Sequence, residues 1–223
     1  MRLMRYHAYR IEKFVERAAK ESNHPGRKVI DIGSHDNPYK KYFDKTDYFS
    51  QDIKQSAGNT IDYVGDINEG MSEMPPSAFD SILCTQVLEH LNKPHKAFQE
   101  FHRILRPGGK VFLTTHLCFE EHMVPYDYFR FTRHGLKFLG ESAGFELIHI
   151  APHGGVFHVI SYLVGTLPIR LFFKERNTFS YYAYVFVFSV PILILNAACS
   201  LLDLLDRDPE LTLNYECIYE KRK

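Results

Sequence analysis

The stretch VIDIGSHDNPY, residues 29–39, contains the turn that decides how this chain folds. An apolar run ends at Asp31 and Ile32, and Gly33 then lets the backbone turn tightly. In open α/β proteins such a turn lies at the ligand-binding edge of the sheet. A dinucleotide loop needs the pattern G-x-G-x-x-G, but His35 and Pro38 occupy its second and third glycine positions. The stretch therefore predicts a strand and a cofactor loop, but not an NAD site.

Apolar runs and helical stretches alternate along the chain from Lys28 onward, which predicts βα units and a mostly parallel sheet. Strands are expected at 28–33, 46–53, 60–67, 79–88, 110–116, 145–150 and 211–221. Helices are expected at 1–20, at 92–105 and at 134–143; the Pro107-Gly108-Gly109 turn would end the second of these.

Residues 154–206 form an apolar insertion between the sixth and seventh strands. The predicted domain organisation is an N-terminal helix (1–27), a core (28–153 and 207–223) and this insertion. Residues 177–202 carry no charge and are long enough to span a bilayer. A single crossing would separate two neighbouring strands, so a helical hairpin is expected. It is a membrane hairpin, a lid over the acceptor or a dimer interface, and the charged link Lys174-Glu175-Arg176 argues against full spanning.

The amino-acid composition limits the partners that we expect for this protein. The 27 Lys and Arg residues equal the 27 Asp and Glu residues, so no nucleic-acid partner is expected. The cysteines form no CxxC pair, and although His116 and His122 flank Cys118, no second ligand pair follows, so no metal site is predicted. Reduced thiols and the absence of a secretory signal pattern predict a cytoplasmic protein, peripheral at a membrane if the insertion contacts one.

Five segments together resemble the successive motifs of class I S-adenosylmethionine-dependent methyltransferases. They are DIGSHDNPY, SQDI, GDI, the stretch FDSILCTQVLEHLNKPHKAFQEFHRILRPGGKVFLTTH, and YDYFRFTRHGLKFLGESAGFE. The likeness covers roughly residues 28–150 and is closest to the type 11-like branch, with V-L-E-H after the fourth strand. It implies a Rossmann-like α/β fold with helices on both faces and strand order 3-2-1-4-5-7-6, the seventh strand antiparallel.

The resemblance also implies a cofactor, S-adenosyl-L-methionine, and the residues that bind it. Asp52 lies about twenty residues after Gly33, where a carboxylate can accept both ribose hydroxyls. His35 stands where the family usually has glycine. The full predicted cofactor set is Asp31, Gly33, Ser34, His35, Asp52, Ile53, Asp66, Ile67, Gln86 and Val87.

Residues after the fifth strand are the candidates for chemistry on the acceptor. If the acceptor is a hydroxyl, a base must take its proton, and histidine titrates near neutral pH. His116, His122 and Asp127 are the catalytic candidates, and Tyr126, Tyr128 and Arg130 are the substrate-binding candidates. Glu89 and His90 have two open interpretations, as organisers of the following helix or as ligand contacts.

The sequence therefore predicts an enzyme that methylates oxygen on a small or lipid-linked acceptor. Two alternatives stay open: a non-catalytic binding protein with the same fold, and a membrane-associated scaffold. A membrane surface contacting residues 154–202 and a second copy of the chain are the other candidate partners.

Overall fold

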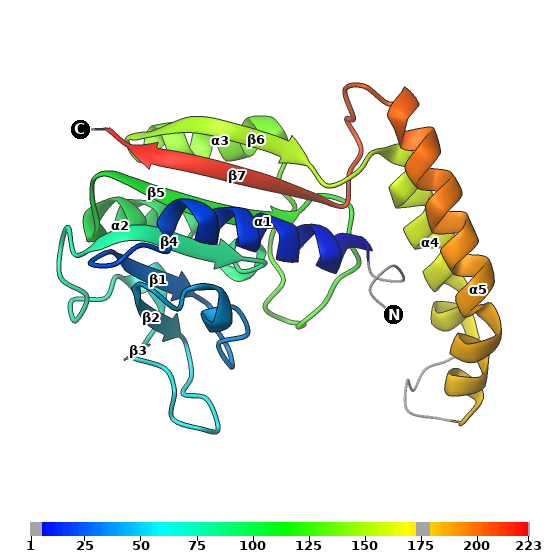
Figure 1. The fold of residues 1–223 in the computed structure, drawn as a ribbon, viewed down its shortest axis with the longest axis horizontal. Helices are drawn as coiled ribbons and strands as arrows, with labels where there is room; N and C mark the ends of the chain where they lie inside the picture. The colour runs from blue at the N-terminus through cyan, green and yellow to red at the C-terminus, as the bar shows by residue number, and fades with distance from the viewer. Residues whose placement is uncertain (1–5, 173–178, 223) are drawn as a thin grey trace. The chain divides into compact units, whose positions relative to one another are not determined.

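A computed structural model describes residues 6–172 and 179–222 of the chain. Its centre is a seven-stranded sheet in the order β3-β2-β1-β4-β5-β7-β6, with β7 antiparallel (Figure 1). The strands are β1 (Lys28–Ile32), β2 (Asp47–Asp52), β3 (Tyr63–Val64), β4 (Phe79–Thr85), β5 (Leu105–His116), β6 (Phe145–Pro152) and β7 (Asn214–Lys221). The predicted fold class, strand order and apolar helical insertion are confirmed.

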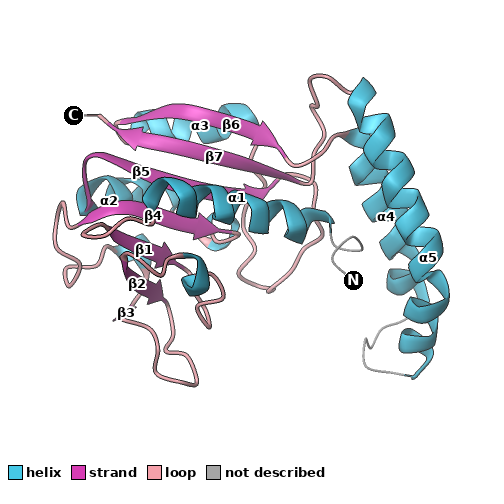
Figure 2. Ribbon diagram, in the orientation of Figure 1, coloured by secondary structure: helices cyan, strands magenta, loops and turns pink. Residues whose placement is uncertain are grey.

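Helices and short 3-10 turns connect the strands (Figure 2). The helices are α1 (Tyr6–Ser22), α2 (Pro94–Ile104), α3 (Arg133–Ser142), α4 (Val156–Phe172) and α5 (Phe179–Leu202). The 3-10 turns are η2 (Lys40–Tyr42), η3 (Ile67–Glu69), η4 (Leu88–His90) and η5 (Asp203–Leu205). By its internal contacts the chain divides into two units, one of residues 11–151 and 215–223, the other of residues 1–10 and 152–214.

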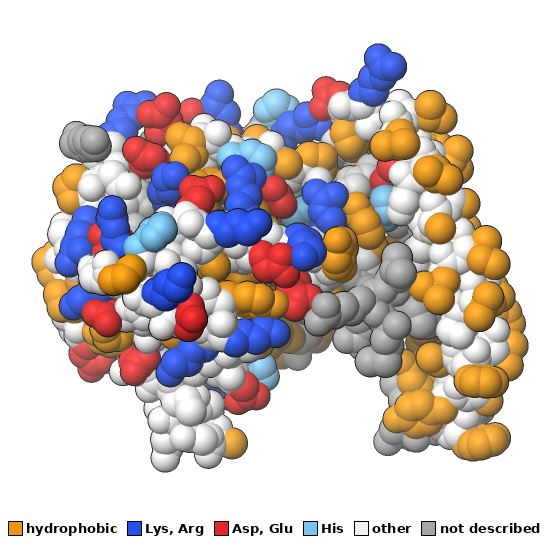
Figure 3. All heavy atoms as spheres, in the orientation of Figure 1, with side chains coloured by type: hydrophobic (Ala, Val, Ile, Leu, Met, Phe, Trp, Pro, Cys, Tyr) orange, Lys and Arg blue, Asp and Glu red, His pale blue; other side chains and the backbone are white. Residues whose placement is uncertain are grey.

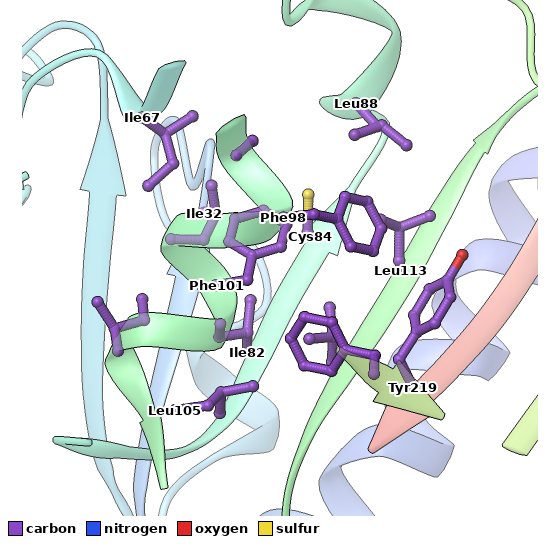
Figure 4. Packing of buried hydrophobic residues seen from close by; sticks show 14 of the residues in the cluster. Ile32, Ile67, Ile82, Cys84, Leu88, Phe98, Phe101, Leu105, Leu113 and Tyr219 are labelled. Carbon is purple, nitrogen blue, oxygen red and sulfur yellow. The ribbon is translucent and has the colours of Figure 1, made fainter. Parts of the chain in front are cut away.

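The two faces of the sheet are covered by different helices, because successive strand residues point to opposite sides. Val29, Leu83, Phe112 and Ile218 pack with the apolar side of α1. The residues beside them in the same strands face α2 and α3, and Figure 4 shows part of this larger cluster. Its labelled members are Ile32, Ile67, Ile82, Cys84, Leu88, Phe98, Phe101, Leu105, Leu113 and Tyr219.

Two strands differ most from their predicted bounds. The third strand was expected over 60–67 but contains only Tyr63 and Val64, because the Ser50 backbone N–H donates to the Asp62 carboxylate (2.8 Å) instead of extending the ladder. The fifth strand was expected over 110–116 but begins at Leu105, directly after α2 ends at Ile104. The Pro-Gly-Gly segment is instead part of β5, where the pairing with β4 shifts register.

The insertion is a pair of apolar helices, α4 and α5, as expected. Tyr181–Leu205 is long and apolar enough to cross a membrane, by length and composition only, and 11% of the apolar window is buried. In Figure 3 the surface over α4 and α5 carries mainly hydrophobic side chains. The Lys174-Glu175-Arg176 link lies outside the described residues. None of the four cysteines forms a disulfide bond.

Candidate functional site

The carboxyl ends of β1, β2, β4 and β5 meet at one edge of the sheet, because these neighbouring strands run parallel. Ile32, Asp52, Thr85 and His116 are the last residues of the four strands. The loops that continue from these ends carry most of the predicted site residues.

Gly33 makes the turn at the end of β1 and packs tightly against the loop that follows β4. Its φ is +68°, and a Cβ atom added there would lie 2.4 Å from Val87 Cγ2. Its backbone N–H donates to the Gln51 carbonyl (2.8 Å). Any larger side chain would therefore strain the backbone and push the two loops apart.

His35 continues this turn without filling it. Its φ is +49°, in the left-handed region, and its side chain is 87% exposed. Its backbone N–H donates to Asp52 Oδ2 (2.9 Å), so the predicted ribose-binding carboxylate also holds the loop. The imidazole that replaces the usual glycine consequently leaves the inside of the loop open.

Gln86 and Asp31 add polar groups to the same edge. Gln86 donates from Nε2 to Thr114 Oγ1 (2.9 Å), and its Oε1 atom is buried and accepts no hydrogen bond from the described residues. Asp31 Oδ2 accepts a hydrogen bond from the Tyr48 hydroxyl (2.6 Å), and burial raises the pKa of Asp31 to about 7. The Gln86 Oε1 atom is thus a fixed hydrogen-bond acceptor near the Gly33 turn. It fits a ligand that carries N–H and O–H donors, as S-adenosylmethionine does.

Four other predicted cofactor residues differ in what they offer. The Ser34 hydroxyl donates to a backbone carbonyl of β2 (3.3 Å), and Asp66 caps η3 by accepting from the Asn68 N–H (2.9 Å). Ile67 is buried in the core, whereas Ile53 is 61% exposed. Among these four, Ile53 has the most exposed side chain and can contact a ligand.

Three imidazoles and a carboxylate gather where β4 and β5 end; we call Glu89, His90, His116 and His122 the imidazole cluster. His116 Nε2 lies 3.3 Å from Glu89 Oε1, and His90 Nε2 lies 3.1 Å from His122 Nε2. Glu89 and His116 are buried, while the side chain of His122 is 27% exposed. Burial raises the pKa of Glu89 to about 7 and lowers the pKa of His90.

Asp127 and Arg130 support the cluster from the loop after β5. Asp127 Oδ2 lies 3.2 Å from His122 Nδ1 and accepts a hydrogen bond from the His122 backbone N–H (2.8 Å). The Arg130 guanidinium binds both oxygens of Asp127 (2.6 and 2.7 Å) and lowers the pKa of that carboxyl below its usual range. Asp127 therefore acts on His122 rather than on a ligand.

Arg130 is bound within its own loop. Besides Asp127, it donates to the carbonyls of Phe119 (3.3 Å), Glu120 (3.0 Å) and Phe129 (2.8 Å). An arginine has five N–H donors, and these contacts engage all five. It has none left for an acceptor, so its role is to hold the loop. Tyr126 and Tyr128 are exposed on that loop and remain substrate-binding predictions.

Glu89 and His90 were absent from the predicted site residues. Both lie in η4. The structure brings them against His116, the last residue of β5, and His122, in the loop after β5. The sequence did carry a signal: an acidic residue and a histidine directly after a buried parallel strand lie at the ligand edge of the sheet.

Comparison with known proteins identifies the family of the chain. The model of the methyltransferase domain family matches residues 3–150, which is more than half of the chain. The ubiquinone biosynthesis O-methyltransferase of Pseudomonas paraeruginosa (strain DSM 24068 / PA7) is 39% identical over 59 residues, 26% of this chain and 25% of that protein. The chain thus matches about a quarter of the length of such curated relatives.

Solved structures share the fold at low sequence identity. A SAM-dependent methyltransferase from Archaeoglobus fulgidus has a TM-score of 0.59 at 14% identity, covering 92% of this chain and 90% of its own. The [4+2]-cyclase SpnF has a TM-score of 0.58 at 16% identity, covering 93% and 80%. These likenesses concern the fold alone, and the family model carries the assignment. The chain belongs to the methyltransferase domain family, the class I S-adenosylmethionine-dependent methyltransferases.

Proposed function

We propose that this protein transfers a methyl group from S-adenosylmethionine to an oxygen atom of a small or lipid-linked acceptor. The observation that carries the proposal is the imidazole cluster. It begins two residues after Val87, which packs against the cofactor glycine Gly33. Three imidazoles beside a methyl-donor site suit an acceptor that must lose a proton, as a hydroxyl does.

Different residues of the site would bind the cofactor and the acceptor. When bound, the cofactor supplies an electrophilic methyl group on a sulfonium. Gly33, Asp52 and Gln86 would hold it at the sheet edge, so that acceptor and donor are in line. The imidazole cluster would take the hydroxyl proton of an acceptor held there, so that its oxygen could accept the methyl group while the electron pair of the carbon–sulfur bond stayed on sulfur. His122 is the cluster histidine that we assign to contact the acceptor, with Asp127 as its positioning residue.

An apolar tail on the acceptor is the second part of the proposal. Side chains along α4 and α5 leave a large apolar surface exposed, including Leu163, Leu167, Phe186 and Ile194. Such a surface is typical of proteins that contact a membrane or a lipid. The relatives named for O-methylation in ubiquinone biosynthesis support the same acceptor class. We infer a cytoplasmic protein that is peripheral at a membrane.

The cofactor part is tested by calorimetric titration of the full chain with S-adenosylmethionine. We expect binding that Asp52→Ala weakens by about 2 kcal/mol, the scale of hydrogen bonds to a charged group. Asp47→Ala, at the opposite and exposed end of β2, is the matched control and should bind like the wild type. A folded wild-type protein that gives no heat would instead indicate a non-catalytic binding protein.

The acceptor part is tested with methyl-labelled cofactor and phenolic acceptors, with and without an isoprenoid tail, presented in vesicles. We expect label on oxygen and faster transfer to the tailed compounds. His122→Ala should lower kcat about 100-fold or more, the contribution of acid–base catalysis, without changing cofactor affinity. Transfer to nitrogen, or equal turnover by His122→Ala, would contradict the proposed chemistry.

A further inference from the structure

The imidazole cluster has the composition of a metal site. Among the described residues, Glu89, His116 and His122 each offer a ligand atom, and these atoms lie within 4.8 Å of one another. Glu89 Oε1 and His116 Nε2 are 3.3 Å apart. Ligands about 2.0 to 2.2 Å from one Zn²⁺ ion in a tetrahedral site are separated by roughly this distance. The spacing therefore suits two ligands of a shared cation.

The hydrogen-bond partners of His90 and His122 also suit a cation. His122 Nδ1 faces two acceptors, Asp127 Oδ2 and the Glu120 carbonyl, each at 3.2 Å. His90 Nδ1 faces the Tyr126 carbonyl at 2.7 Å. These acceptors favour the tautomer with the hydrogen on Nδ1, which would leave a lone pair on each Nε2 atom for a cation. The two Nε2 atoms are 3.1 Å apart, and a cation beside them would remove the repulsion between those lone pairs.

Glu89 contributes a buried oxygen that the protein does not use in a hydrogen bond. Its side chain is fully buried, and Oε2 accepts a hydrogen bond from Thr115 Oγ1 (2.8 Å). Oε1 accepts none from the described residues and points to His116. Burying a carboxylate in this way is costly unless a positive charge lies beside it.

The groups behind the cluster are those that support metal ligands in other proteins. A ligating histidine usually donates its second ring N–H to a carboxylate or carbonyl, and a ligating carboxylate is itself hydrogen-bonded. His122 has Asp127 in that position, and Arg130 fixes both oxygens of Asp127. The Thr115 hydroxyl likewise donates a hydrogen bond to Glu89 Oε2 and holds that carboxylate in place.

We propose that Glu89, His116 and His122 bind one divalent transition-metal ion of the Zn²⁺ type, with His90 beside it. Two imidazoles and one carboxylate are a donor set that zinc and its neighbours prefer, and three protein ligands leave a coordination position open. In that position a hydroxyl acceptor would bind the ion through oxygen, which lowers the pKa of the hydroxyl, and its proton would pass to His90, the cluster histidine that does not ligate the ion. This catalytic role rests on the proposed function, whereas the binding of the ion does not.

Metal binding is measured directly on the full chain after removal of metals with a chelator. We titrate ZnCl₂ calorimetrically and record the visible absorption of the protein with CoCl₂. We expect one ion per chain, a cobalt spectrum typical of nitrogen and oxygen ligands, and much weaker binding of MgCl₂, because magnesium prefers oxygen ligands and water.

Three variants locate the site. His122→Ala changes a partly exposed side chain and should fold; Glu89→Gln tests the buried ligand, with circular dichroism confirming its fold. Each should weaken Zn²⁺ binding by more than the 10- to 100-fold typical for loss of a supporting group. His149→Ala is the matched control, because His149 also pairs with a carboxylate, Glu216 at 2.9 Å, in β6 and β7. It should bind Zn²⁺ like the wild type.

Equal Zn²⁺ affinity in the wild type, His122→Ala and Glu89→Gln would overturn the metal site and leave a buried Glu–His pair. Titration of S-adenosylmethionine in the same samples separates the two proposals. Cofactor binding without specific Zn²⁺ binding removes the metal site alone. Specific Zn²⁺ binding without cofactor binding removes the proposed methyl transfer and keeps the metal site.

Discussion

Three residues at the cofactor edge have a left-handed backbone, but they differ in the room around them. The φ angles are +68° at Gly33, +49° at His35 and +57° at Gln86. The His35 side chain is directed into solvent, whereas Gly33 has Val87 directly against it. Packing against Val87 therefore requires the family's first glycine here, Gly33. The second glycine can be replaced by His35, because the side chain at that position points into solvent.

Substitution of Gly33 by alanine tests this distinction. Gly26 has a similar φ of +76° but no atom within 4 Å of an added Cβ. We expect Gly26→Ala to cost roughly 1 kcal/mol of unfolding free energy for the left-handed backbone alone. Gly33→Ala should cost more in urea unfolding and should also weaken cofactor binding by calorimetry. Equal losses in the two variants would show that the contact with Val87 is unimportant.

The buried carboxyl of Asp31 makes stability depend on pH. Its pKa in the folded protein is about 7, above the ordinary 3.8, so the folded state binds more protons between these values. The free energy of unfolding should therefore fall as pH rises from about 4 to about 7, and Asp31→Asn should reduce that slope in urea unfolding. The rest of the slope belongs to Glu89, whose pKa is also raised to about 7.

Asp80 has a pKa shift of the opposite sign, so its effect on the pH dependence of stability is also opposite. Its burial raises its pKa, but bonds from the Lys28 N–H, Arg27 and Arg106 outweigh burial and lower it. Its contribution is present above the ordinary pKa and is lost as pH falls below about 4. Asp80→Asn should therefore change stability at neutral pH and leave the slope between about 4 and 7 in place. A slope that is as steep in Asp31→Asn as in the wild type would contradict the assignment.

At the scale of elements, the two apolar helices depend on a polar junction where α5 ends and α4 begins. Asp203 in η5 accepts hydrogen bonds from the backbone N–H groups of Gly155 (2.7 Å) and Phe157 (3.1 Å) and pairs with His158. These N–H groups have no partner within the helix. A residue from the far end of the insertion thus caps its first helix and closes the hairpin.

Removal of this cap should open the hairpin locally. We expect Asp203→Ala to speed hydrogen exchange of the Gly155 and Phe157 amides at least tenfold and to lower stability by about 1 kcal/mol or more, as other cap losses do. Glu210→Ala changes an exposed acidic residue near the same junction and serves as the control. Unchanged exchange in Asp203→Ala would mean that the hairpin closes without this cap.

At the scale of the whole molecule, the surface carries two kinds of exposed phenylalanine. Phe186 lies on α5, within the apolar surface of the hairpin, and is 83% exposed. Phe138 lies on α3 and is 73% exposed, among the polar residues of that helix. If the hairpin contacts a membrane, Phe186 should insert into the membrane surface and Phe138 should stay in water.

Sedimentation with uncharged phosphatidylcholine vesicles tests the membrane contact. We expect the wild-type protein to bind at low and at high salt, because the contact is apolar. Phe186→Ser should weaken binding by about tenfold or more, since burial of a phenylalanine contributes roughly 1.5–3 kcal/mol. Phe138→Ser should bind like the wild type. Equal effects of the two substitutions would favour the dimer interface or the lid.

The sequence by itself determined the succession of strands and helices, the cofactor loop and the apolar insertion, from signals that are local in the chain: apolar periods, the turn at Gly33, and aspartates at strand ends. The sheet order was predicted from the resemblance to the methyltransferase family. The short third strand was missed because Asp62 competes for a backbone N–H of β2, a choice made between segments rather than within one. The same reason explains the early start of the fifth strand, where pairing with β4 drew Leu105 into the strand.

Only the tertiary structure decided what the acceptor side of the site contains. The sequence predicted no metal site, because His116 and His122 have no second ligand pair nearby in the chain. Folding places Glu89 beside His116, 27 residues later in the chain, and His90 beside His122, 32 residues later. It also directs the donors of Arg130 to the surrounding loop. Contacts between strand ends depend on sheet register and loop packing, which no local pattern encodes.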